Sequence, residues 1–424
     1  MTAACRPIDR PWLKPAAGFL VLAGAAVFVA GVLGAGPERA WQAYLVNFVF
    51  WTGLACGSLL FSVVLTITNA RWGRPLKRIA EAPGAFLPVS FVLFWVLYLG
   101  KDNIFPWIAH PVPEKAAWLN VPFLFARDGL GLFCLAAVGL AIIYHSVKRD
   151  QEATAGSPLD LGETRQGDER QGNEPHGGER HQVQRNGEER HGRALSVLSI
   201  VYGILYAFIL TLIAFDLIMS LSPHWYSTLF GAYYFMGSFY AGLAALMILA
   251  GLCVKTTGMG RFIRSLQFHN LGKLMTGFCL VTGDFFFTQF MVIWYGNLPE
   301  ETHFVITRVR QATWAPLAWT VLIACYVFPF AVLLSRKIKT KLGPMLALST
   351  LILSGIWLER LLLVAPSLWT ADHLPLGMIE VAITAGFLGL MTLCVILFLE
   401  RFPVLPVGDP LFWELMDRDS EQVE

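Results

Sequence analysis

The chain of 424 residues is poor in charged side chains, which make up 15% of it, while apolar residues make up 55%. Soluble globular proteins carry about 25% charged residues. Basic and acidic residues nearly balance, at 32 and 30, and no basic face appears beyond the ends of the long apolar runs. We therefore exclude nucleic-acid binding as a main role and expect a membrane protein with several spans.

Closely spaced cysteines are also lacking, because the seven cysteines never come closer than 26 residues to one another. This excludes the CxxC spacings that hold zinc or iron–sulfur clusters. A b-type haem needs two histidines facing each other across helices, and no histidine lies at the centre of a predicted span. We expect no metal, haem or cluster on this chain. A haem held by His145 and His269, near the ends of their spans, is the open alternative.

Ten apolar stretches reach the roughly 20 residues that a helix needs to cross a bilayer. No stretch alternates like a barrel strand, so we expect an all-α polytopic fold. The first stretch is too long for a signal peptide and has no clear cleavage site, so we interpret it as a span. The predicted spans are 16–36, 44–69, 84–105, 127–147, 195–221, 227–254, 267–296, 312–335, 343–365 and 377–400.

Basic residues in the connections are distributed unevenly, with 16 on one side of the predicted membrane and five on the other. The positive-inside rule then predicts that both termini are cytoplasmic. Residues 148–194 repeat Glu-Arg pairs among Gly, Gln and Asn, which is typical of a disordered, solvated linker. A metal-binding tract formed by His176, His181 and His191 is the alternative for this segment.

A weak internal repeat relates the fifth and ninth spans. Asp216 precedes Pro223 by seven residues, and Glu359 precedes Pro366 by seven residues. An offset of four spans makes the repeated units parallel, which predicts two four-helix bundles, spans 2–5 and 6–9, flanked by spans 1 and 10. The predicted segments are 1–43 (first span), 44–147 (spans 2–4), 148–194 (linker), 195–221 (span 5), 222–365 (second bundle) and 366–424 (last span and cytoplasmic tail).

Ionisable residues inside spans are costly, at about 2.5 to 3.5 kcal/mol near the bilayer centre, and mark candidate functional sites. Acids at several depths suggest a proton pathway, with Asp284 near the midplane. For some of them a structural role is open: Arg360 and Glu380 as a simple ion pair, and Asp216 and Glu359 as caps of polar pockets. Lys101, Asp102, Arg127 and Asp128 are expected to be interface anchors. The proton-relay candidates are Asp216, Lys273, Asp284, Glu359, Arg360 and Glu380.

Several motifs resemble a known family. They are Pro37–Trp41 (PERAW), Tyr44–Phe48 (YLVNF), Ala70–Pro75 (ARWGRP), Arg78–Ala82 (RIAEA) and Phe215–Gly231 (FDLIMSLSPHWYSTLFG). Together they resemble the NrfD-like, polysulfide-reductase-type integral membrane subunits of bacterial alternative complex III. The resemblance is closer to the second of the two such subunits, ActF. The first usually has a Gly-His-Ala-Gly motif in its second span, where this chain has Gly53-Leu54-Ala55-Cys56-Gly57.

The resemblance implies a haem-free membrane subunit of a respiratory quinol:cytochrome c, or quinol:oxidase, oxidoreductase in the bacterial inner membrane. The implied partners are multihaem cytochrome c subunits, a large iron–sulfur subunit and a second NrfD-like ten-span subunit. The haems c and iron–sulfur clusters would lie on those partners, and this chain would scaffold them and conduct protons. His224 is a possible group on the quinol side.

Two other functions stay open at this point. The first is an ion-coupled secondary transporter, because Pro88, Pro316 and Pro329 are able to break spans 3 and 8. The second is a purely structural anchor for redox subunits outside the membrane.

Overall fold

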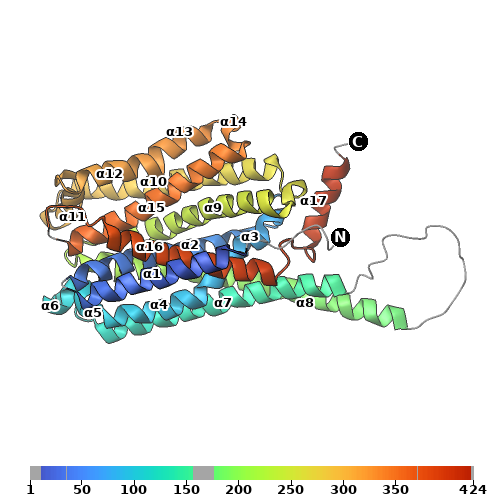
Figure 1. Cartoon of the computed structure of the whole chain (residues 1–424), viewed down its shortest axis with the longest axis horizontal. Helices are drawn as coiled ribbons and strands as arrows, with labels where there is room; N and C mark the ends of the chain where they lie inside the picture. The colour runs from blue at the N-terminus through green and yellow to red at the C-terminus, as the bar shows by residue number, and fades with distance from the viewer. Residues whose placement is uncertain (1–10, 35, 156–175, 370, 422–424) are drawn as a thin grey trace, which may run out of the picture.

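The computed structural model describes residues 11–34, 36–155, 176–369 and 371–421, and of residues 154–155, 176–189, 257, 261 and 417–421 the backbone alone. These residues are helical apart from their connections and form no strand. Within them, ten helices are long and apolar enough to cross a membrane. The helices lie side by side along the long axis of the molecule (Figure 1). The chain is therefore a multi-pass, all-α membrane protein, as the sequence predicts.

The first four-helix bundle, called bundle one, is a closed ring in which each helix packs against the next. A series of short turns, η1 (Arg74–Leu76), α3 (Lys77–Glu81) and η2 (Ala82–Phe86), leads into its second span. Short helices α5 (Lys101–Ile104), α6 (Pro106–Ala109) and η3 (Pro113–Lys115) join the second span to the third. The four spans of the ring are α2 (Pro37–Ile67), α4 (Leu87–Leu99), α7 (Val121–Ala155) and α8 (His176–Leu217).

Bundle two is a second ring of four spans and is joined to bundle one by η4 (Met219–Leu221). Its third span is interrupted: α12 (Ala315–Leu322) passes through a π-helical turn, η6 (Ile323–Val327), into α13 (Phe328–Leu334). The other spans are α9 (Phe230–Thr257), α10 (Ser265–Gly296) and α15 (Leu342–Leu368). The connections are η5 (Met259–Arg261), α11 (Pro299–Arg310) and α14 (Arg336–Lys339).

The two bundles meet where α2 crosses α9, and α8 packs on α9 as α15 packs on α2. Small residues spaced by four on both helices let the backbones approach closely. A methyl group added at Gly57 would lie 2.2 Å from the carbonyl oxygen of Ser238, and one at Gly242 would lie 2.4 Å from the backbone of Gly57. The last span of each bundle thus packs on the first span of the other, and the spans form the two bundles, 2–5 and 6–9, that the parallel repeat predicts.

Helices α1 (Leu13–Leu33) and α16 (Met378–Arg401) pair with each other and pack against α2, outside both rings. Their contact again depends on small residues, since a methyl group added at Gly24 would lie 2.6 Å from the Cα of Gly386. The first and last spans thus flank the bundles as expected.

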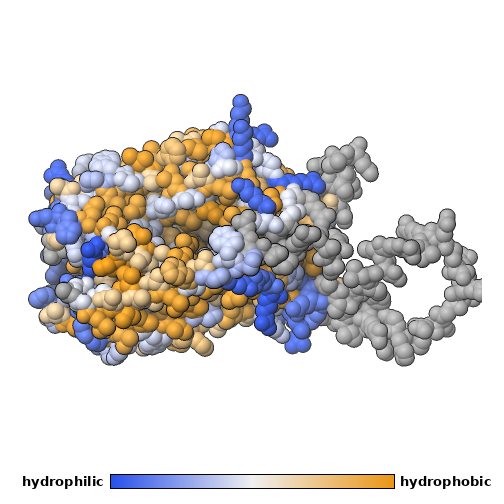
Figure 2. Space-filling model, viewed as in Figure 1, coloured by the Kyte–Doolittle hydropathy of each residue, from blue (hydrophilic) through white to orange (hydrophobic). Residues whose placement is uncertain are grey.

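The molecule has two distinct ends (Figure 1). We call the end with α17 (Pro410–Glu421), where α7 ends and α8 begins, the linker end, and the opposite end, with α5, α6 and α11, the α11 end. Figure 2 shows hydrophobic residues covering the middle of one face, with hydrophilic residues at both ends, as expected of a membrane-spanning belt. That the linker end is cytoplasmic stays a prediction of the positive-inside rule.

A buried ion cluster at the linker end fixes the C-terminal segment against bundle one. Asp409 accepts a hydrogen bond from Arg74 at 2.8 Å, lies 2.8 Å from Arg149 Nη2 and lies 3.6 Å from Lys77 Nζ. Burial by itself raises the pKa of Asp409, but the positive charges of Lys77, Arg149 and Arg74 outweigh it and lower the pKa to about 2. Beside it, Arg78 forms ion pairs with Glu81 and with Asp150.

The predicted linker at 148–194 is helical at both of its ends. Helix α7 continues to Ala155 and α8 begins at His176, while residues 156–175 lie outside the described part of the chain. Arg149 and Asp150, at the start of the predicted linker, are buried in the ion cluster. The folded part of the molecule therefore extends into this segment.

Candidate functional site

A cavity of about 110 Å³ lies inside bundle two at the α11 end. Most of its wall is aromatic and aliphatic, contributed by α9, α10, α11, α12 and α15. A few polar side chains line the same space, as is usual for binding sites in proteins. These side chains are Tyr233, Gln289, Arg308, Tyr326 and Glu359.

Glu359 is the acidic residue of this cavity. It projects from the half of α15 nearer the α11 end, where its side chain is only 3% exposed. Oε1 accepts a hydrogen bond from Nη1 of Arg360 at 3.1 Å, whereas Oε2 has no hydrogen-bond partner among the described residues. A buried carboxylate oxygen without a donor is energetically costly and calls for a functional explanation.

Two tyrosine hydroxyls accompany this carboxylate. The hydroxyl of Tyr233 lies near Glu359 and is 3.2 Å from the hydroxyl of Tyr326. Tyr326 belongs to the π-helical turn η6, and such turns within α-helices occur frequently at functional sites. Because hydroxyls both donate and accept hydrogen bonds, the pair is suited to passing a proton to or from Glu359.

Arg308 holds a buried positive charge beside the cavity and pairs with no carboxylate in the described chain. Its guanidinium donates to the carbonyls of Leu362 (3.0 Å) and Leu363 (2.8 Å), and to Ser367 Oγ (3.0 Å). Pro366 has no N–H to donate to Leu362, so Arg308 satisfies the carbonyl that proline leaves free. Burial lowers the pKa of Arg308 to about 9, so it stays charged at neutral pH.

The cavity lies directly beneath the apolar surface of the bundle. Three of its lining residues, Phe286, Phe290 and Val309, are more than a third exposed on the outside of the molecule. On the inner side, Trp225 and Phe304 stack with ring centroids 3.7 Å apart. Part of the cavity wall is therefore also part of the outer apolar surface of bundle two.

Arg360 is fully buried and points toward α9. It lies over the ring of Tyr234, 4.4 Å from the centroid, and donates to the Tyr234 carbonyl at 3.4 Å. Gly237 leaves space for it, since a methyl group there would come within 3.1 Å of Nη2. The expectation that Arg360 pairs with Glu380 is wrong, because Arg360 pairs with Glu359.

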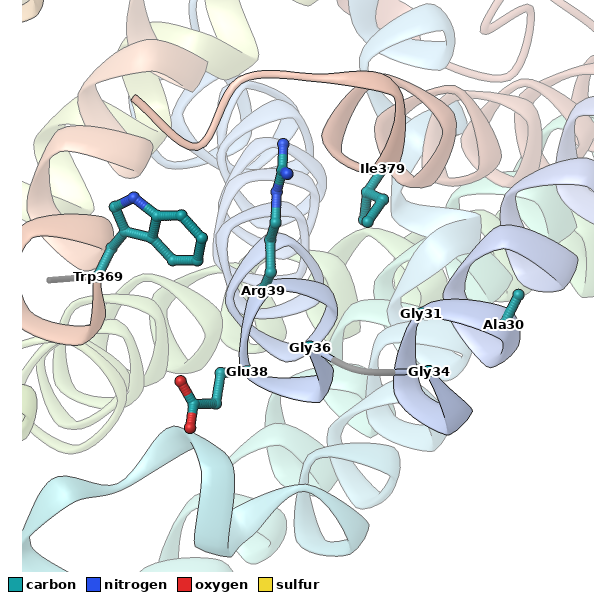
Figure 3. A pocket seen from close by; sticks show the side chains of 8 residues that line it. All are labelled: Ala30, Gly31, Gly34, Gly36, Glu38, Arg39, Trp369 and Ile379. Carbon is teal, nitrogen blue, oxygen red and sulfur yellow. The ribbon is translucent and has the colours of Figure 1, made fainter. Parts of the chain in front are cut away.

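Glu380 instead pairs with Arg39 at the α11 end. The guanidinium donates twice, to Oε1 at 2.6 Å and to Oε2 at 2.9 Å, and Glu380 also accepts from the backbone N–H of Gly377. Arg39 borders an open pocket of about 450 Å³, in which it lies between Trp369 and Ile379 while Glu38 points away (Figure 3). With both carboxylate oxygens occupied, Glu380 joins the ends of α2 and α16.

Asp216 belongs to a separate buried cluster in bundle one. It accepts hydrogen bonds from Arg127 Nε at 2.6 Å and Nη2 at 2.5 Å, and from Trp118 Nε1 at 2.9 Å. Asp128 also contacts Asp216, is completely buried and has no donor for either oxygen among the described residues. Arg127 and Asp128 are therefore not interface anchors, because they complete the environment of Asp216.

The remaining candidates lie apart from both clusters. Asp284 and Lys273 are exposed on the outer face of α10. His224 is exposed in the loop before Trp225, whose ring lines the cavity. Of the acids predicted to form a ladder, the structure buries Asp216 on the last span of bundle one and Glu359 on the last span of bundle two, and it does not bring them together in one cluster.

The histidines considered as ligands are placed differently. Nδ1 of His145 lies 2.8 Å from Nδ1 of His191, and Nε2 of His191 lies 3.3 Å from Glu152. The side chains of His176 and His181 lie outside the described residues. In the described part of the chain, no group of three or more ligating side chains has the arrangement of a metal site.

Neither a search of protein-family models nor a search of curated proteins finds a match to this chain.

Tyr233, Tyr326 and Arg308 are site residues that the sequence does not single out, and Asp128 is one that it assigns to the membrane interface. The position of Pro366, seven residues after Glu359, is a usable signal for Arg308, because it leaves a carbonyl that needs a donor. The two tyrosines carry no comparable signal, since no motif or spacing distinguishes them from the other tyrosines of the chain, 11 in all.

Proposed function

We propose that the chain is a haem-free membrane subunit of a respiratory quinol:cytochrome c, or quinol:oxidase, oxidoreductase complex in a bacterial inner membrane. In this role it scaffolds the redox subunits and conducts protons through bundle two. The observation that carries the proposal is the free Oε2 of Glu359 at an apolar, aromatic cavity beneath the outer apolar surface of bundle two. The family resemblance of Phe215–Gly231 and the other motifs supplies the class of complex.

The chemistry expected at the cavity is proton transfer. Oxidation of a quinol releases two electrons and two protons, and the protons need an acceptor inside the low-dielectric membrane. Glu359 offers one free oxygen, and the hydroxyls of Tyr233 and Tyr326, 3.2 Å apart, extend the path from it. A cavity of about 110 Å³ also has room for several water molecules.

The two arginines balance charge during this transfer. Arg360, at 3.1 Å, supplies the counter-charge of ionised Glu359. Arg308, whose guanidinium donates only to neutral oxygens, adds a second positive charge. This charge stabilises the ionised form of Glu359. When Glu359 takes up or releases a proton, only the charge of its carboxylate changes, while the positive charges of Arg360 and Arg308 stay in place.

The Asp128–Asp216 pair is the corresponding group in bundle one. Arg127 neutralises one carboxylate, and Asp128 has no other donor, so a single proton held between the two acids satisfies both. Placed at the same end as Glu359, it forms a second station for protons. Both stations lie on the side that the positive-inside rule assigns to the exterior.

The complex is tested by mild-detergent purification of tagged chain from its native membrane, with mass spectrometry and a haem spectrum of the eluate. The proposal expects multihaem cytochrome c, a large iron–sulfur protein and a second ten-span subunit. A colourless chain recovered alone contradicts it. A complete complex whose proton release is insensitive to Glu359→Gln leaves only the structural-anchor function.

One observation favours a second function, ion-coupled secondary transport. Transporters often place a broken helix beside a midplane acid, and η6 interrupts the span that faces Glu359. The parallel packing of the bundles weighs against the inverted repeats common in transporters. Solute uptake into vesicles containing this chain alone is the result that would establish it.

A further inference from the structure

Asp284 occupies an unusual position on the outside of bundle two. Its side chain is exposed, and it forms no hydrogen bond or ion pair with any residue that the structure describes. It lies 12 residues, roughly 18 Å, from the nearer end of α10. Trp294 and Tyr295, which suit the membrane interface, follow about 15 Å farther along the helix. A short Asp side chain cannot reach the interface from this depth.

The surroundings of Asp284 are apolar and open. Leu280, Val281 and Phe287, within one turn of it, are 50%, 38% and 57% exposed. Gly277 lies two turns toward the linker end, and a methyl group added there would meet nothing within 4 Å. This face of α10 is therefore shaped for a second helix, with a small residue where backbones approach closely.

Lys273 completes the pattern on the same face. Eleven residues separate it from Asp284, which is close to three helical turns, so the two side chains point in nearly the same direction. Lys273 forms no ion pair with any residue that the structure describes, and its titratable neighbours His269 and Lys339 supply no negative charge. The face thus presents one negative and one positive group, roughly 16 Å apart along the axis.

We propose that the face of α10 formed by Lys273, Gly277, Leu280, Asp284 and Phe287 binds a transmembrane helix of a different protein. That helix carries a Lys, Arg or His opposite Asp284 and an acidic residue opposite Lys273. A second copy of this chain does not fit, because a twofold axis along the membrane normal would place Asp284 against Asp284 and Lys273 against Lys273. A lipid does not satisfy a carboxylate at this depth.

The inference is independent of the proposed respiratory function, because it needs only that α10 spans the membrane. It is tested with a photo-activated cross-linking amino acid at Leu280 or Phe287 in the full chain, expressed in its native membrane. Leu22, which is 72% exposed on α1, is the matched control position. Cross-linked peptides are then sequenced by mass spectrometry.

The proposal expects adducts at 280 and 287, absent at 22, with a helix of another protein that has a basic residue at the depth of Asp284. Asp284→Asn is expected to lower the adduct yield about fivefold to thirtyfold, and Asp284→Glu to retain it. Because leucine is apolar, Asp284→Leu is compatible with contact to lipid, and we expect this variant to stay folded and monodisperse in detergent. We also expect it to give no adduct with the partner helix.

Three outcomes overturn the proposal. They are adducts with lipid alone, adducts with a second copy of this chain, and adducts with a helix that has no basic residue at this depth. Equal yields for native chain and for Asp284→Leu also overturn it, since the carboxylate would then contribute nothing to the contact.

Discussion

Glu359 and Arg360 form a buried ion pair with 3.1 Å between Oε1 and Nη1, although consecutive residues of a helix point roughly 100° apart. The pairing is possible because Arg360 turns toward Tyr234 while Glu359 faces the cavity. The geometry occupies one carboxylate oxygen and leaves the other free. Glu359 is thereby fixed in place and still able to accept a proton.

The stability of this pair is tested by a double-mutant cycle. Arg360→Met leaves Glu359 buried without a counter-charge, which we expect to destabilise the chain by about 3 to 5 kcal/mol. Adding Glu359→Gln removes the uncompensated charge and is expected to restore most of that loss. Unfolding midpoints in detergent measure both, with exposed Lys255→Met as control. A double variant no more stable than Arg360→Met alone would show that the charges are not coupled.

Arg308 and Pro366 are expected to be coupled through the Leu362 carbonyl. Arg308→Met removes the donor to the Leu362 carbonyl, which Pro366 cannot replace, at about 1 to 3 kcal/mol for this buried group, while Ser367 Oγ keeps its contact with Ser222 Oγ at 2.8 Å. Pro366→Ala supplies the missing backbone N–H, so it is expected to reduce the cost of Arg308→Met. Thermal unfolding of the single and double variants measures this coupling, and strictly additive effects would argue against it.

The crossing of α2 and α9 is expected to be intolerant of added volume. In Gly57→Ala the new methyl group would lie 2.2 Å from the Ser238 carbonyl oxygen, so the helices must separate, at a cost of about 1 to 3 kcal/mol. Gly203→Ala on α8 is the matched control, because a methyl group there meets nothing within 4 Å. It is expected to be neutral or stabilising. Thermal unfolding with similar losses for the two variants would contradict the close crossing.

The linker-end ion cluster predicts a defined pH dependence. The pKa of Asp409 is about 2 in the folded chain, below its ordinary value of 3.8, so the folded state favours the ionised form. The resulting stability, about 2 kcal/mol, is fully present above about pH 4 to 5 and is lost as the pH falls toward 2. The difference in unfolding midpoint between native chain and Asp409→Asn measures it. A difference that grows with acidification would contradict this sign.

The sequence predicts the ten spans well because a membrane helix needs about 20 apolar residues, whatever its neighbours. Several boundaries differ by five residues or more: α4 ends at Leu99 rather than at 105, α7 covers Val121–Ala155 rather than 127–147, and α8 begins at His176 rather than at 195. Helix α2 begins at Pro37 rather than at 44, because proline suits the first turn of a helix. Asp216 and Glu359, which the repeat pairs with each other, are both buried, but bundle one also buries Asp128, which the sequence analysis assigns to the interface.

The direction in which a span residue points is much harder to predict. Lipid-facing and core-facing residues are both apolar, so periodicity does not distinguish the outside of α10, with Asp284, from its inside. Partners are equally hidden, since Glu380 meets Arg39 from the opposite end of the sequence. Depth along a helix is readable from the sequence, and contacts between helices are not.

The most direct test of the central claim is the number of protons released per electron by the purified complex in vesicles carrying Glu359→Gln. Gln keeps the size of Glu359 and removes its titratable group. The account predicts an assembled complex whose proton release or turnover falls at least about tenfold, which corresponds to about 1.4 kcal/mol in the barrier, while Glu38→Gln, on an exposed acid, changes neither. Unchanged turnover and an unchanged proton-to-electron ratio in Glu359→Gln would contradict it.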